Sequence, residues 1–186
     1  MERYFKEAID LLEKVLREQT MIGTMRETVE AVKDCLRNGN KLLIAGNGGS
    51  AADSQHFAAE LMGKFLKERR PFAAVALTTD TSMLTAWSND ASFETVFARQ
   101  VEALGKPGDV FIAISTSGNS KNLVAALKKA KGLGLRTVGL LGNAGGAMKE
   151  LCDLAVIVPD DSTPRVQQVH EIVFHAICEE VERELA

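Results

Sequence analysis

Four side-chain hydroxyls lie within six residues near the middle of the chain, on Ser115, Thr116, Ser117 and Ser120. They follow an apolar run, 110–114, that is typical of a buried strand, and they precede a helical pattern over 121–131. A loop between a strand end and a helix start gathers free backbone N–H groups at the positive end of the helix dipole. We therefore expect this hydroxyl loop, residues 115–120, to bind a phosphate group. A polar turn in which Ser120 only caps the helix is the alternative.

A second loop of the same kind, residues 46–50, is rich in glycine and joins an apolar run to another helical pattern. Glycines such as Gly48 and Gly49 let a ligand approach the backbone closely. The loop contains neither G-x-x-x-x-G-K-[ST] nor G-x-G-x-x-G, so nucleoside triphosphates and dinucleotides lose their main support as ligands.

His56 and Glu60 stand four residues apart in the helix that follows this glycine-rich loop. The spacing puts both side chains on one helical face, where they could bind one metal ion or act as a base and its partner. An isolated pair of this kind is more often a solvated surface pair, and that alternative stays open on spacing alone.

The last helix carries a polar stripe next to an apolar one. Its polar members are Gln167, His170 with Glu171, and His175. A lone histidine such as His175 is commonly a satisfied residue at a helix interface. The two polar helices act together only if the last helix crosses the ligand crevice.

Composition narrows the class of protein. The chain has 186 residues, a formal net charge of −3 and no long basic run, so nucleic acid is not the expected partner. Three scattered cysteines without a C-x-x-C motif indicate reduced thiols, as in a cytoplasmic protein. The first residues are charged and helical in pattern, unlike a signal peptide, and no apolar run approaches the roughly 20 residues that span a membrane. We expect a cytoplasmic protein with no membrane partner.

The periodicity predicts which elements position these residues. Amphipathic helices over 3–19 and 24–38 precede the first strand, and we expect residues 1–39 to form a helical hairpin on the core or on a neighbouring subunit. Strands are predicted at 41–45, 73–77, 109–114, 136–141 and 154–158, with helices between them and a long helix from 163 to about 185. This alternation predicts one α/β domain over residues 1–186, a three-layer, flavodoxin-like sandwich with a parallel sheet in the order 2-1-3-4-5. The two loops then meet at the switch point of the sheet, which favours the phosphate site over the simple turn.

The combined motifs resemble the sugar-isomerase (SIS) family, and within it the branch of phosphoheptose isomerases. The resemblance runs nearly from end to end. The matching segments are GNGGSAADSQHFAAEL (46–61), ALTTD (76–80), TAWSND (85–90), FARQV (97–101), ISTSGNS (114–120) and RVQQVHEIVFH (165–175).

The resemblance implies a homotetramer that converts sedoheptulose 7-phosphate into glycero-manno-heptose 7-phosphate, for the heptose of lipopolysaccharide or related glycans. Glu60 would be the base and His175 its acid/base partner. The implied substrate contacts are Asn47, Gly48, Gly49, Glu60, Asn89, Asp90, Ser115, Thr116, Ser117, Ser120 and Gln167.

The same resemblance implies one Zn²⁺ ion per subunit and no nucleotide cofactor. The implied ligands are His56, Glu60, Gln167 and His175. The two sets of roles conflict, because a metal-bound carboxylate is a weaker base and a metal-bound imidazole cannot freely shuttle protons. Lewis-acid catalysis is the physical alternative.

Three other functions compete with this expectation. A non-enzymatic SIS protein that binds the bacterial replication initiator keeps much of the same framework, but here Glu60, Gln167 and His175 are all present. A sugar-phosphate sensor would usually carry a helix-turn-helix module, for which this chain has no room. The sequence distinguishes poorly between this activity and that of an isomerase for a pentose or hexose phosphate, because the shape of the pocket determines which sugar length is accepted.

Overall fold

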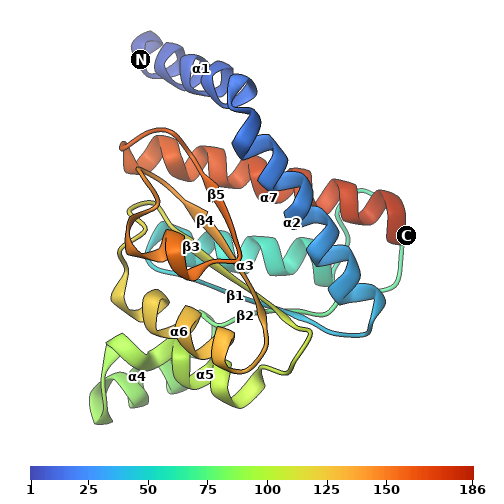
Figure 1. Cartoon of the computed structure of the whole chain (residues 1–186), viewed down its shortest axis with the longest axis vertical. Helices are drawn as coiled ribbons and strands as arrows, with labels where there is room; N and C mark the ends of the chain where they lie inside the picture. Colours follow the sequence, from blue (N-terminus) through green and yellow to red (C-terminus); the bar gives the residue numbers. More distant parts are fainter.

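The protein is built on a five-stranded parallel sheet in the order β2-β1-β3-β4-β5, as the computed structural model of residues 1–186 shows (Figure 1). The strands are β1 (Leu42–Gly46), β2 (Ala74–Ala76), β3 (Val110–Ser115), β4 (Arg136–Leu141) and β5 (Leu154–Ile157). The helices are α1 (Glu2–Arg17), α2 (Gln19–Arg37), α3 (Gly49–Met62), α4 (Thr81–Asp90), α5 (Val96–Leu104), α6 (Lys121–Gly132) and α7 (Thr163–Leu185), with 3₁₀ turns η1 (Phe93–Thr95) and η2 (Gly146–Leu151). The predicted α/β class and strand order are confirmed.

The central strands are buried on both faces, so the fold has two cores. Leu42 and Ile44 of β1 pack with residues of α2, α3 and α7 on one face. Leu43 and Ala45 point the other way and pack with residues of α5, α6 and η2. The alternation of side chains along a strand therefore divides one apolar run between the two helical layers.

The structure corrects the predicted helical hairpin at the N-terminus. Only Glu18 separates α1 from α2, and α2 begins at Gln19, five residues before the predicted start. Figure 1 shows α2 continuing from the end of α1 with a bend, so the two helices form a bent rod. Gly23 lies inside α2, where an added Cβ would meet nothing within 4 Å, and a glycine in a helix interior weakens the helix without ending it.

One other predicted boundary was wrong. Strand β2 is three residues long, shorter than the predicted 73–77.

Helices α3 and α7 pack together through an aromatic stack and a buried ion pair. Phe57 and Phe174 are stacked with ring centroids 5.2 Å apart, and both are fully buried. Near the ends of the helices, Arg69 Nε donates to Glu182 Oε1 at 2.9 Å, and each side chain is only 2% exposed. The packing therefore sets how the two polar helices face each other.

The same ion pair also satisfies the end of α3 and the segment after it. The guanidinium of Arg69 donates to the carbonyl oxygens of Glu60 and Leu61 at 2.8 and 2.9 Å. The carboxylate of Glu182 accepts hydrogen bonds from the backbone N–H groups of residues 65–67. Burial alone would raise the pKa of Glu182, but these hydrogen bonds and the Arg69 charge outweigh it and hold the pKa below its usual range.

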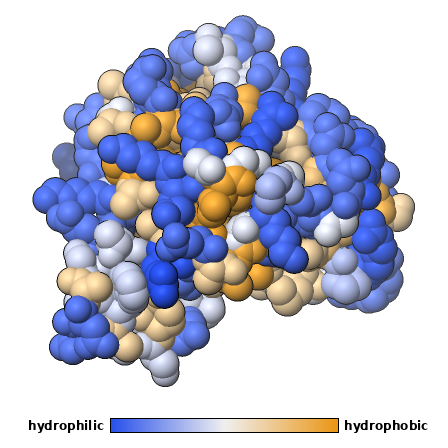
Figure 2. Space-filling model, turned by 60° about the horizontal axis from the view of Figure 1, so that its bottom comes forward, coloured by the Kyte–Doolittle hydropathy of each residue, from blue (hydrophilic) through white to orange (hydrophobic).

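The surface carries mixed polarity. Figure 2 shows a largely hydrophilic face with hydrophobic residues gathered near its middle. None of the helices combines the length and the apolar character that crossing a bilayer requires.

We predict that Glu182→Gln lowers the free energy of unfolding by about 3–5 kcal/mol, because it leaves the buried Arg69 charge unpaired. Glu180→Gln removes an exposed partner of Arg183 on the same helix and should cost less than about 1 kcal/mol. Urea unfolding of both variants measures this difference.

The pH dependence of the free energy of unfolding also tests the Arg69–Glu182 ion pair. The folded-state pKa of Glu182 is lowered, so its contribution is present above the unfolded pKa and is lost as pH falls through the folded value. Glu182→Gln should therefore lose less stability than the wild type on acidification. Equal acid slopes, or a cost below 1 kcal/mol at neutral pH, would contradict the assigned role.

Candidate functional site

The hydroxyl loop forms a compact turn at the carboxyl end of β3. Ser115 Oγ lies 3.1 Å from Ser120 Oγ and 3.5 Å from Ser117 Oγ, and it accepts the Gly118 N–H at 3.1 Å. Ser120 is the N-cap of α6, yet its hydroxyl caps no helical N–H group. The alternative in which Ser120 only caps the helix therefore has no hydrogen bond to support it.

The backbone of this loop keeps donors available for an anion. The N–H groups of Thr116, Ser117 and Ser120 donate to no other atom of the chain. They lie at the N-terminal end of α6, where the helix dipole favours negative charge.

The turn after β4 and the first residues of η2 support the hydroxyl loop. Met148 N–H donates to the Gly118 oxygen at 2.9 Å, and Ala147 N–H donates to Asn119 Oδ1 at 2.9 Å. Gly118 has a φ of +65°, and a Cβ added there would lie 2.1 Å from the Gly145 oxygen. Only glycine fits this contact, so the loop shape depends on two neighbouring backbones.

The glycine-rich loop lies next to the hydroxyl loop, because β1 pairs with β3 and Gly46 is in register with Ile114. Gly48 adopts a φ of +57°, and α3 starts at Gly49. A Cβ on Gly49 would meet the Gln167 side chain at 2.4 Å. Helix α7 therefore does reach the crevice at the switch point, as the polar-stripe hypothesis requires.

A cluster of two imidazoles and two carboxylates lies between α3 and α7. His56 Nε2 is 2.9 Å from Glu60 Oε1 and 3.4 Å from His175 Nε2, and His56 Nδ1 is 3.7 Å from Glu171 Oε1. The His56 side chain is 41% exposed and Glu60 is 23% exposed, so a small molecule can reach the cluster. The contact with His175 means that His56 and Glu60 are more than a solvated surface pair.

Gln167 lies beside a buried carboxyl group in the same crevice. Its Nε2 is 3.4 Å from Asp53 Oδ1, while Asp53 Oδ2 is buried without a hydrogen-bond partner. Burial raises the pKa of Asp53 to about 6, the Gln167 hydrogen bond opposes the rise, and the charge of Glu171 adds to it.

His170 does not join the polar stripe. It is fully buried, and no hydrogen bond of standard geometry reaches either ring nitrogen. Burial lowers its pKa to about 4, and a weaker interaction with the Leu141 backbone opposes the shift. The stripe that faces α3 is Gln167, Glu171 and His175, at strict four-residue spacing, which turns His170 by about 100° toward the core.

Asn89 and Asp90 are not brought to the cluster within one chain. Asn89 Nδ2 donates to Asp90 Oδ1 at 2.8 Å, and both residues are exposed at the end of α4. Helix α4 packs mainly on η1 and α5.

The structure adds three residues that the sequence analysis did not assign to the site: Asp53, Asn122 and Glu171. The spacing of Glu171, four residues from both Gln167 and His175, places all three on one face of the helix. Asp53 precedes His56 by three residues, which places it on the same side of α3. Asn122 gave no local signal, because its partner is far away in sequence.

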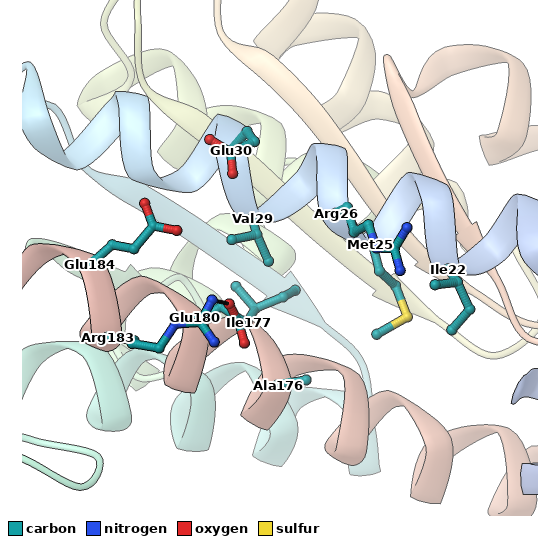
Figure 3. A pocket seen from close by; sticks show the side chains of 10 residues that line it. All are labelled: Ile22, Met25, Arg26, Val29, Glu30, Ala176, Ile177, Glu180, Arg183 and Glu184. Carbon is teal, nitrogen blue, oxygen red and sulfur yellow. Dashed lines mark hydrogen bonds and ion pairs between the residues drawn. The ribbon is translucent and has the colours of Figure 1, made fainter.

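A separate groove of about 400 Å³ opens between α2 and α7. Its apolar lining includes Ile22, Met25 and Val29 on one side and Ala176 and Ile177 on the other, and Figure 3 shows these side chains across the groove. Charged residues surround this lining, and no residue of the cluster borders it.

The fold and its two loops define a doubly wound α/β protein whose ligand crevice lies at the switch point of the sheet. The SIS domain family matches residues 3–142. The chain belongs to this family.

Relatives with high identity cover nearly the whole chain. It is 49% identical over 185 residues to a phosphoheptose isomerase of Clostridium acetobutylicum, spanning 100% of this chain and 94% of that protein. It is 53% identical over 170 residues to a phosphoheptose isomerase of Aliarcobacter butzleri, spanning 89% and 90%. Among solved structures, the phosphoheptose isomerase of Neisseria gonorrhoeae superposes with a TM-score of 0.92 at 40% identity, covering 98% of this chain and 96% of that chain.

Proposed function

We propose that this chain is an aldose–ketose isomerase that converts sedoheptulose 7-phosphate into glycero-manno-heptose 7-phosphate. The observation that carries the proposal is the contact of His56 with Glu60 and His175, on two helices that meet at the glycine-rich loop of the switch point. Relatives with this activity in their names, about 50% identical over the chain, support the same reaction. None of these names favours the initiator-binding or sensor alternatives.

The reaction moves a proton between two adjacent carbons. A base removes the proton from C1 of the ketose, the electrons shift to form an enediolate, and a proton returns to C2 to give the aldose. Glu60 is the proposed base, and His175 is the proposed partner that moves protons on the oxygens. The hydroxyl loop holds the phosphate at the far end, which orients the reacting carbons.

We also propose that Zn²⁺ binds at the cluster, through His56, Glu60, Gln167 and His175. The donor atoms of a tetrahedral zinc site lie roughly 3.3 Å apart, and imidazole and carboxylate are suitable ligands. The separations of His56 Nε2 from Glu60 Oε1 and from His175 Nε2 are 2.9 and 3.4 Å, close to that spacing. The three residues whose ligand atoms all lie within 4.8 Å of one another are His56, Glu171 and His175, so Glu171 competes with Glu60 as the carboxylate ligand. Gln167 lies in the same crevice but makes its contact with Asp53, so it is the least supported of the four.

A bound zinc ion would polarise the sugar carbonyl and stabilise negative charge on oxygen. Glu60 could then serve as ligand, as base, or as both through its two oxygens. Comparing the activity of the metal-free protein with that of the zinc-loaded protein decides between these roles for Glu60 and His175.

We propose that the protein assembles as a homotetramer. Helix α1 exposes Phe5, Ile9 and Leu16, which are 65%, 55% and 70% exposed, along one helical stripe. The groove between α2 and α7 adds a second apolar surface. Burying such surfaces against other copies removes apolar area from water.

A turnover assay with purified protein tests the activity. We expect sedoheptulose 7-phosphate to be isomerised with a higher kcat/KM than pentose or hexose phosphates. Glu60→Gln should lower kcat by about 10²–10⁴-fold, the usual contribution of a positioned base. Glu68→Gln, in an exposed pair with Lys64, is the control and should retain activity. A fully active Glu60→Gln protein would exclude Glu60 from the chemistry.

Metal analysis tests the zinc site. We expect about one zinc per chain in the wild type, loss of zinc and activity on chelation, and recovery on adding zinc back. His175→Ala should lose bound zinc, while Glu180→Gln on the same helix should keep it. Full activity in protein that contains no metal would refute the proposed ion.

Sedimentation equilibrium tests the assembly. Wild-type protein should run as a tetramer, and Ile9→Asp should shift it toward smaller species, since a charge cannot be buried cheaply in an apolar interface. Asp10→Ser, a polar change on the same helix, should leave the tetramer intact. A monomeric wild type at micromolar concentration would overturn this proposal.

A further inference from the structure

Asn47 and Asn122 form a reciprocal pair of side-chain hydrogen bonds across the crevice. Asn47 Nδ2 donates to Asn122 Oδ1 at 2.9 Å, and Asn122 Nδ2 donates to Asn47 Oδ1 at 2.9 Å. The two residues are 75 positions apart in sequence, one in the glycine-rich loop and the other in the first turn of α6. The pair thus joins the two loops that flank the switch point.

The orientation of both amides follows from one backbone group. A reciprocal amide pair remains satisfied if both amides turn over together, so the pair alone does not fix either one. Leu123 N–H donates to Asn122 Oδ1 at 2.9 Å, and an N–H group can only donate. Asn122 must therefore keep its oxygen toward Leu123. Asn47 must then keep its Nδ2 group toward that oxygen and its Oδ1 toward Asn122 Nδ2.

We propose that Asn122 is a positioning residue, which fixes the Asn47 amide so that it offers one N–H donor and one oxygen lone pair to the sugar in a single orientation. Asn122 is only 4% exposed, so it acts through Asn47 and has little surface of its own for the substrate. The inference rests on the proposed function and on Asn47 as a sugar contact.

Loss of the Asn47–Asn122 pair should affect sugar binding but not phosphate binding. An asparagine amide has two N–H donors and two lone pairs, and the pair uses one of each on Asn47. Without Asn122, the amide can turn by 180° and exchange donor for acceptor at the sugar. The Ser115, Ser117 and Ser120 hydroxyls make no hydrogen bond to Asn122, so phosphate binding should change little.

Kinetics of Asn122→Leu, with sedoheptulose 7-phosphate as substrate and inorganic phosphate as a competitive inhibitor, test the proposal. We expect kcat and kcat/KM each to fall about five- to tenfold while the inhibition constant of phosphate stays within about twofold. Asn122→Asp keeps the oxygen that accepts from Leu123 and Asn47, so kcat should recover relative to Asn122→Leu. The added charge should weaken phosphate inhibition. Asn40→Leu is a matched control at the opposite end of the strands, just before β1, where Asn40 Nδ2 donates to Pro107 O and Asp109 Oδ1. It should lower stability without changing the kinetics.

Unchanged kcat/KM in Asn122→Leu would overturn the proposal, and so would parallel losses of kcat/KM and phosphate affinity, which indicate a distorted loop. A wild-type protein that isomerises no sugar phosphate would refute the proposed function instead. Calorimetry then tests Asn122 separately: its replacement by leucine should weaken sedoheptulose 7-phosphate binding more than inorganic phosphate binding. Equal weakening of both would overturn the positioning role.

Discussion

The packing of α3 against α7 is the constraint on which the candidate site depends. Neither helix carries a complete set of polar residues: His56 and Glu60 come from α3, and Gln167 and His175 come from α7. The stacked rings of Phe57 and Phe174 and the buried Arg69–Glu182 pair hold the two helices in register. Because Arg69 also binds the Glu60 carbonyl oxygen, the ion pair fixes the backbone of a proposed catalytic residue.

The parallel sheet imposes a second constraint, on the loops. The carboxyl ends of all five parallel strands lie on the same side of the sheet. The order β2-β1-β3-β4-β5 places the loops after β1 and β3 beside each other there. Their contacts are specific: the hydroxyl loop rests on the Gly145 backbone, and the glycine-rich loop lies against Gln167. The hydroxyl loop is thus held by neighbouring backbone, whereas the cluster of His56, Glu60 and His175 remains partly open to solvent.

Much of this arrangement was predictable from sequence because its causes are local or topological. Apolar runs such as 110–114 mark buried strands, and the alternation of strands and helices restricts the strand order. What sequence could not predict depends on long-range contacts. The Asn47–Asn122 pair spans 75 positions, and nothing at either residue indicates the other. His170 was included in the stripe because it lies three residues after Gln167, and Glu171 lies four residues after it. These two positions point about 100° apart around the helix. Only the packing of α7 decides which of them faces α3 and which is buried.

One buried polar atom without a hydrogen-bond partner lies in the crevice of the candidate site. A buried polar atom without a partner costs about 1–3 kcal/mol, and native proteins keep few of them. Asp53 Oδ2 is one, in a residue whose pKa is raised to about 6 and which contacts Gln167. Perturbed carboxyl groups of this kind concentrate at functional sites. Since Asp53 lies on α3 between the glycine-rich loop and the histidine cluster, its cost to stability falls where the proposed substrate contacts and the proposed reacting groups meet.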